Sequence, residues 1–104
     1  MARFDVHANL NPSSRERVPY LIDLQADLLS GLSTRLAAPL VPVGRFGQPA
    51  ARLNPVFRIG ARNFVMDTAL IAGVPATQLG VRAASLGERS TDVLGALDFL
   101  VSGI

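Results

Sequence analysis

The residues of this chain that could carry acid–base or metal chemistry are few and widely separated. His7 is the only histidine, and the sequence contains no cysteine. A general base in a nuclease is one role open to His7, but an exposed or half-buried position on a strand is the simpler interpretation. Without a thiolate or a carboxylate pair at ligand spacing, the sequence predicts no metal site.

Asp23 and Asp27 are four residues apart, which would place them on one face of a helix. On a strand the same two carboxylates lie on one side about 13 Å apart, because each residue advances the chain by about 3.3 Å. Glycosidases hold their two catalytic carboxyls closer together than this. We therefore expect a solvated face or a contact with a partner here, and no paired acid–base chemistry.

Other enzyme motifs are missing from the sequence as well. Neither a G-x-G-x-x-G nor a Walker A phosphate-binding pattern occurs, and all ten basic residues are arginine. No histidine or lysine stands ready to activate a serine or threonine hydroxyl. These observations predict no catalytic residues and no cofactor, and they favour a protein that acts by binding.

The charge pattern gives little support to nucleic-acid recognition. The formal net charge is +2 at pH 7, and the arginines are scattered from Arg3 to Arg89. Nucleic-acid-binding domains gather their basic residues on one face or in one run. We expect no direct sequence-specific binding of nucleic acid.

Length and hydrophobicity indicate one domain spanning residues 1–104. The chain has 104 residues, and 49% of them are hydrophobic, which is enough to build a core without metals or disulfides. No run of 18 apolar residues exists to span a membrane, and the first residues lack the apolar centre of a signal peptide. We expect a cytoplasmic protein.

Alternating and β-rich segments fill the first three-quarters of the chain. Pro39 and Pro42 fall within one of them, which predicts an edge strand or a bend there. Turn residues predict a loop over residues 44–49, a break at Val74-Pro75 and a turn at Gly80. The predicted strands cover residues 3–8, 18–26, 34–43, 55–59 and 63–68.

A single helix is predicted at the C-terminal end. Ser85 and Glu88 fit an S-x-x-E capping box, and Asp92 would lie near the first turns, where the helix dipole favours negative charge. Gly95 costs about 1 kcal/mol relative to alanine, which the apolar stripe outweighs. Phe99 falls off that stripe, so it packs on a loop or faces a partner. The stripe consists of Val93, Leu94, Leu97, Leu100 and Val101.

This helix runs directly into Ser102-Gly103-Ile104. A chain end held against a core-packed helix is fixed in one pose, whereas most chain ends fray. The final residues are therefore a candidate recognition element. The alternative is that Ile104 continues the apolar stripe and fills the core.

The order of several short motifs resembles the CcdB family, toxins of bacterial toxin–antitoxin pairs that poison DNA gyrase. Each motif is weak alone, but their order and spacing cover nearly the whole chain. The motifs are Phe4, Ile22–Asp27, Ala38-Pro39-Leu40, Asn54–Gly60, Val74-Pro75 with Gly80, and the terminal Gly103-Ile104.

The resemblance implies a mainly β fold, an SH3-like antiparallel barrel with a small β wing and one C-terminal helix, assembled as a homodimer. It also implies that the C-terminal residues contact the gyrase A subunit and trap its cleaved-DNA complex, and that a cognate antitoxin neutralises the toxin. The gyrase-binding residues would be Asp98, Ser102, Gly103 and Ile104.

Two of these positions depart from the family pattern. The family's contact ends in Trp-Gly-Ile, and this chain has Ser102 in place of the tryptophan. Such an aromatic buries 150–250 Å² and is a typical hot spot, so its loss favours weaker poisoning of a standard gyrase. Asp98 brings a charge where the related toxin has asparagine.

Two alternatives remain open at the level of sequence. One is an endoribonuclease on the same barrel, as in the MazF toxins, which would need an RNA groove and a residue to activate the ribose 2′-hydroxyl. The other is a degenerate homologue that binds antitoxin without poisoning gyrase.

Overall fold

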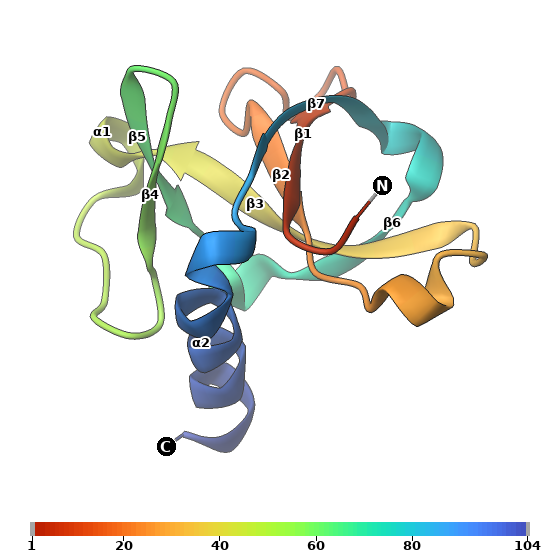
Figure 1. Ribbon diagram of the computed structural model, residues 1–104. Helices are drawn as coiled ribbons and strands as arrows, with labels where there is room; N and C mark the ends of the chain where they lie inside the picture. The colour runs from red at the N-terminus through yellow and green to blue at the C-terminus, as the bar shows by residue number, and fades with distance from the viewer. Residues whose placement is uncertain (1, 104) are drawn as a thin grey trace.

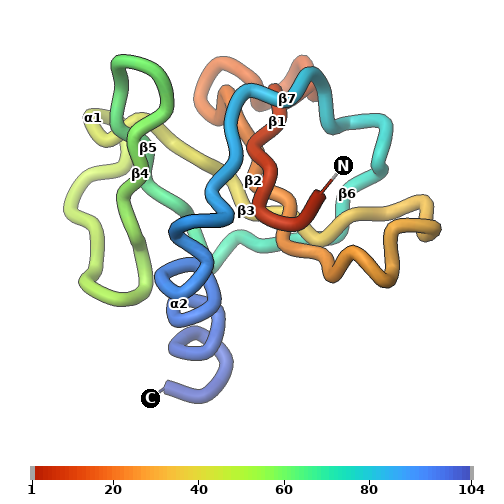
Figure 2. The backbone as a smooth tube through the Cα atoms, in the orientation of Figure 1, coloured from red at the N-terminus to blue at the C-terminus, as the bar shows by residue number. Residues whose placement is uncertain are grey.

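A computed structural model describes residues 2–103 of the protein (Figures 1 and 2). Short turns of 3-10 helix join several of the strands and precede the last helix. The strands are β1 (Asp5–Asn9), β2 (Tyr20–Asp23), β3 (Thr34–Pro42), β4 (Val56–Ile59), β5 (Arg62–Met66), β6 (Ala72–Pro75) and β7 (Leu79–Ser85). The helices are α1 (Val43–Phe46) and α2 (Ser90–Ser102), with 3-10 turns η1 (Asp27–Leu29), η2 (Thr68–Leu70), η3 (Ala76–Gln78) and η4 (Gly87–Arg89).

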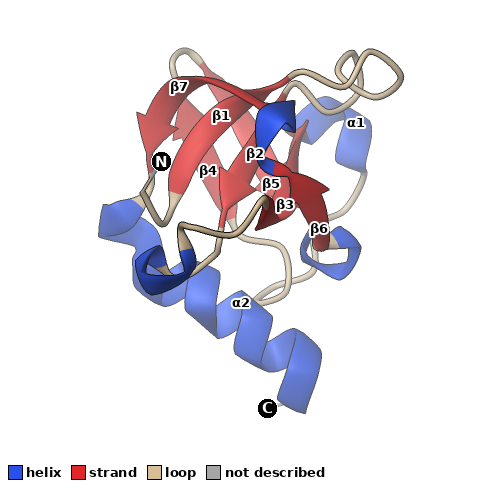
Figure 3. Cartoon of the chain, turned by 90° about the vertical axis from the view of Figure 1, so that its right-hand side faces the viewer, coloured by secondary structure: helices blue, strands red, loops and turns tan. Residues whose placement is uncertain are grey.

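The strands form one antiparallel sheet in the order β4-β5-β3-β2-β1-β7, and β6 also pairs with β3. The sheet curls into a half-barrel, and α2 leaves it on one side (Figures 1 and 3). The β4–β5 hairpin extends from the second half of β3 and corresponds to the expected wing. The structure thus confirms the predicted mainly β fold with a C-terminal helix.

Of the edge strand or bend predicted for the proline-containing strand, the edge is wrong, because β3 lies in the middle of the sheet. Its residues 34–37 pair with β6 and its residues 40–42 pair with β5, so the partner changes between them. Pro39 lies in this gap, where its carbonyl accepts a hydrogen bond from the Asp67 amide at 2.9 Å. In a strand, the backbone nitrogen and carbonyl of one residue point to the same side. Those of Pro39 point away from β2, so the missing N–H of proline removes no hydrogen bond between β3 and β2.

Two strands, β6 and β7, were missed where breaks were predicted. Val74-Pro75 ends β6, and Gly80 lies inside β7, which pairs with β1 through two irregular steps. A Cβ on Gly80 would be 2.9 Å from Leu10 Cδ2 and 3.1 Å from the Ala8 carbonyl oxygen. Glycine is needed here for the close approach of two strands and not for a turn.

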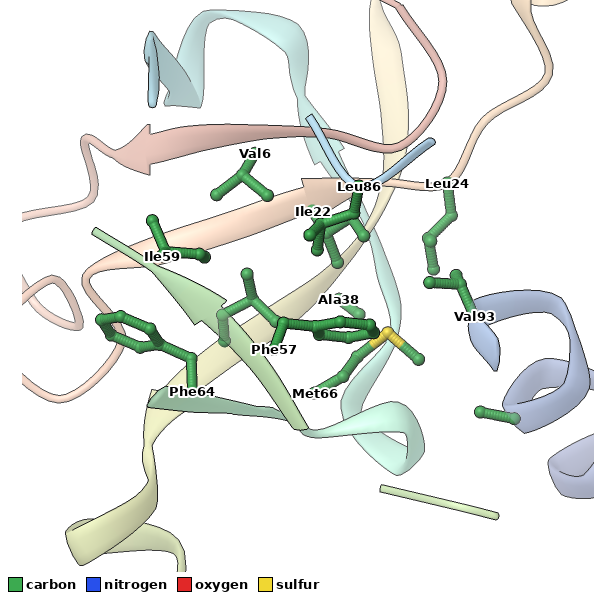
Figure 4. Close-up of a cluster of buried hydrophobic side chains, with 12 residues drawn as sticks. Val6, Ile22, Leu24, Ala38, Phe57, Ile59, Phe64, Met66, Leu86 and Val93 are labelled. Carbon is green, nitrogen blue, oxygen red and sulfur yellow. The ribbon is translucent and has the colours of Figure 1, made fainter. Parts of the chain in front are cut away.

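The main core lies between the curled sheet, the β4–β5 hairpin and the start of α2 (Figure 4). A smaller cluster covers the opposite side of β2 and β3, so these strands are buried on both faces. The main core contains Val6, Ile22, Leu24, Ala38, Leu40, Phe57, Ile59, Phe64, Met66, Leu86, Val93 and Ala96. The smaller cluster contains Val18, Leu21, Ala37, Val41 and Leu79.

A buried ion pair joins β2 to β3. Arg35 is 1% exposed and Asp23 is 0% exposed, and the Asp23 carboxylate accepts from Arg35 Nε at 3.1 Å and Nη2 at 2.5 Å. Its other oxygen accepts from the Gln25 amide at 3.1 Å. The predicted solvated face at Asp23 is therefore wrong, because Arg35 supplies the counter-charge that its burial requires. Asp27 lies beyond the end of β2, in η1.

The predicted capping box is also wrong. Ser85 ends β7, its hydroxyl accepts from the Gly87 amide at 3.4 Å, and no side chain caps α2. The η4 turn intervenes, so α2 begins at Ser90. Asp92 lies in the first turn of the helix, as expected from the dipole.

We predict that Arg35→Met destabilises the protein by about 3–5 kcal/mol, because it leaves Asp23 as an uncompensated buried charge. The double variant Asp23→Asn/Arg35→Met should cost clearly less than the sum of the two single changes. Urea denaturation of all four proteins measures the coupling. Additive effects would mean that the pair contributes nothing as a unit.

Candidate functional site

The outward face of α2 carries the residues predicted from the C-terminal motif. Successive residues of a helix are rotated by roughly 100°, so Thr91, Gly95, Asp98 and Ser102 share one face. All four are exposed, whereas Val93 is buried on the opposite side. We call these four residues the outer stripe. The sequence prediction named Asp98 and Ser102 and missed the first half of the stripe.

The second half of α2 extends away from the sheet (Figure 1). Val101 is 80% exposed and Leu100 is 37% exposed, so the expectation that the whole apolar stripe packs in the core is wrong. Only Val93 and Ala96 of this helix are buried. The sheet is too short to cover the last turns, which leaves an apolar side of the helix uncovered.

The end of α2 is held by a glycine cap. Gly103 adopts φ 72°, a left-handed conformation that favours glycine, and its amide donates to the Phe99 carbonyl at 2.8 Å. Ser102 and Gly103 are exposed, and Ile104 lies outside the described residues. Within residues 2–103, Asp98 forms no ion pair. Its charge is therefore open to a partner.

Phe99 packs on a loop, which was one of its two predicted roles. The guanidinium of Arg52 lies 4.6 Å from the centroid of the Phe99 ring. Arg52 has φ 70°, which costs an L-residue roughly 1–2 kcal/mol. An exposed cation–π contact returns only about 0.5–1 kcal/mol. The cation–π contact therefore stabilises the fold by less than the strained backbone of Arg52 destabilises it.

A cavity of about 380 Å³ lies where this loop meets α2. We call it the helix cavity; its lining residues are Arg52, Pro55, Arg89, Thr91, Asp92 and Gly95. Arg89 pairs with Asp92 at 2.7 Å and stacks 4.7 Å from the Phe57 ring centroid. Arg52 has no acidic partner among the described residues. The cavity therefore carries one uncompensated positive charge beside the outer stripe.

A second apolar surface lies at the η1 turn. Leu28 is 94% exposed, with Leu29 and Leu32 exposed beside it. The Arg3 amide donates to the Asp27 carboxylate at 2.8 Å, and Gln25 Nε2 donates to the Leu29 carbonyl at 2.9 Å. We call these three leucines the η1 tip. The turn lies on the same lower side of the sheet as α2 (Figure 1, orange), and an exposed apolar group of this kind marks an interaction surface.

A cavity of about 370 Å³ opens on the other side of β2 and β3. Its floor includes Leu21, Val41 and Phe46, and Arg17 and Asp67 line it as well. Burial raises the pKa of Asp67, an effect partly offset by the charge of Arg17. We call it the sheet cavity.

His7 is buried in the β1–β7 seam, and not exposed or half-buried as predicted. Its Nδ1 atom lies 2.9 Å from the Gly80 carbonyl oxygen, and its Nε2 atom is buried without a hydrogen-bond partner. Nearby, burial of the Asp5 carboxyl is outweighed by the Ala2 amide and by Arg82, so the pKa of Asp5 is lowered. The position of His7 gives it no access to a substrate.

Within residues 2–103, no group of three potential metal ligands occurs. In the same part of the chain, no helix is long and apolar enough to cross a membrane. The candidate site is therefore a surface for binding, built from the outer stripe, the helix cavity and the η1 tip. The consecutive leucines Leu28 and Leu29 could have indicated the η1 tip from the sequence. No sequence pattern indicates the role of Arg52.

We predict that Asp67→Asn stabilises the protein at pH 7. The folded state raises the pKa of Asp67, so the ionised carboxylate disfavours folding above that pKa. The gain should shrink as the pH falls through the folded-state pKa and vanish below 3.8, the ordinary pKa of an aspartate side chain. Thermal unfolding at several pH values measures it, with the exposed Asp98→Asn as the control. A gain that persists at pH 3 would contradict this cause.

Comparison with protein families identifies the family of this chain. The family model for the CcdB protein matches residues 3–103, which is nearly the whole chain. Members of this family are toxins of type II toxin–antitoxin systems that act on DNA gyrase. The chain belongs to the CcdB family.

Proposed function

We propose that this protein is a cytoplasmic toxin that binds the gyrase A subunit through the exposed end of α2 and traps the cleaved-DNA complex. The observation that carries the proposal is the uncovered second half of α2, which presents Asp98, Ser102 and Gly103 to the solvent. Family membership supplies the target class. Ile104 would complete the contact, and the η1 tip adds apolar area on the same side of the molecule.

We further propose that a second copy of the chain covers the apolar side of α2. Val101 lies on one flank of the helix, next to the outer stripe but not part of it, and Leu97 on the same flank is only half-buried against the main core. Val101 is 80% exposed, and large apolar residues gathered on one helix flank are typical of a subunit interface. A homodimer of this kind would bring two outer stripes together.

The proposal includes neutralisation by a cognate antitoxin, which the family implies. No enzymatic step is required, because trapping the gyrase–DNA intermediate is a consequence of binding.

An endoribonuclease remains the alternative of another class, but the buried position of His7 does not favour it. Incubation with single-stranded RNA tests it directly, and cleavage would favour that alternative. The degenerate toxin is tested by inducing the chain alone in cells.

We predict that Ser102→Trp strengthens binding to a standard gyrase A fragment. A tryptophan anchor contributes about 2 kcal/mol, which is roughly thirtyfold in affinity. Isothermal titration calorimetry with the purified fragment measures the difference. Ser102→Ala serves as the control, since it removes the hydroxyl and adds no area. Equal affinities for the tryptophan variant and the wild type would exclude this contact.

We also predict that deleting residues 102–104 abolishes growth inhibition and leaves folding intact. Ser102 and Gly103 are exposed, so little core is lost with them. Circular dichroism and thermal unfolding check the fold, and induction in cells checks the toxicity. A truncated protein that still arrests growth would remove the chain end from the mechanism.

A further inference from the structure

No close contact and no backbone conformation in the free fold requires a glycine at position 95. It lies inside α2, where glycine weakens a helix, yet its φ is not positive and a Cβ added there would meet nothing within 4 Å. Alanine would fit without any adjustment. The effect of the missing side chain is to leave the helix backbone open at the edge of the helix cavity, where another chain can approach closely.

Arg52 is a second residue that the free fold does not explain. Its φ of 70° is uncommon outside glycine, and strained conformations of this kind gather at functional sites. Stacking on Phe99 favours one orientation of the guanidinium, and no carboxylate within residues 2–103 pairs with it. The protein therefore places an unpaired cation at the helix cavity.

The two residues belong to one continuous surface. Thr91 and Gly95 line the helix cavity and also form the first half of the outer stripe, whose second half is Asp98 and Ser102. Arg89 is already neutralised by Asp92, so Arg52 provides the only excess charge among the residues that line the cavity. The stripe is thus positive beside its first half and negative at Asp98.

We propose that the helix cavity binds a carboxylate side chain of the partner polypeptide that docks on the outer stripe, and that Arg52 selects this acidic group. A planar guanidinium held by an aromatic ring suits a bidentate contact with a carboxylate. Gly95 allows the acidic segment to lie close to the helix, and Asp98 repels a wrongly oriented chain. The carboxylate chemistry rests on the cavity, whereas the identity of the partner as gyrase A rests on the proposed function.

The pocket is tested without gyrase by an NMR titration of the full-length labelled protein. The probe is an amidated tri-glutamate peptide, compared with tri-glutamine and with a short oligothymidylate. We expect saturable shifts at Arg52 Nε–H and at the Thr91 and Gly95 amides with tri-glutamate alone. Arg52→Gly should abolish them while relieving the strained backbone, and Arg58→Ala, an exposed arginine outside the cavity, should keep them. Equal shifts with tri-glutamine, shifts that survive Arg52→Gly, or saturation by the oligonucleotide instead would overturn the inference.

The partner is tested by measuring the affinity of the same variants for a gyrase A fragment. Arg52→Gly should weaken binding about tenfold and reduce its salt dependence, while Arg52→Lys weakens it less. Gly95→Ala should raise the melting temperature and also weaken binding. Unchanged affinity in Arg52→Gly would overturn the role of Arg52 at this interface. If the wild type fails to bind gyrase A but binds tri-glutamate, the proposed function fails and the pocket remains.

Discussion

The buried contact between Asp23 and Arg35 organises the centre of this protein. Two charges removed from water are tolerated only when they satisfy each other, so β2 and β3 must pair in the register that brings them together. The same carboxylate fixes the Gln25 amide, and the Gln25 side chain then bonds to the backbone of Leu29 and Leu36. One buried interaction thus anchors the sheet and the base of the η1 tip.

The long strand β3 explains the shape that follows from this centre. The first half of β3 pairs with β6 and its second half pairs with β5. The sheet therefore divides and curls instead of remaining flat. The curled sheet encloses one main core and leaves room for only the first half of α2. Val93 and Ala96 fill that space, and the rest of the helix extends beyond it (Figure 1). The uncovered helix is therefore a consequence of the size of the sheet.

The exposed surfaces of α2 differ in their chemistry. The flank with Val101 is apolar, the outer stripe is small and polar, and the helix cavity beyond it carries the charge of Arg52. In the related toxins a tryptophan anchors the contact with gyrase, whereas this chain has Ser102 at that position. Recognition on this helix would then depend more on charge and close approach than on aromatic burial. Charge complementarity mainly determines which partner is accepted and how fast it associates.

The sequence by itself predicted the mainly β fold, the strands that correspond to β4 and β5, the C-terminal helix and the family, because these depend on local periodicity and on the order of motifs along the chain. The family resemblance named Asp98 and Ser102 as candidates for gyrase binding, and the structure shows that both are exposed on the helix. Only the tertiary structure placed β6 and β7, since both are defined by partners far away in the sequence. Likewise, the burial of Asp23 and the stacking of Arg52 on Phe99 arise between segments separated by 12 and 47 residues. Contacts of that kind leave no periodic pattern, so they are decided only when the chain folds.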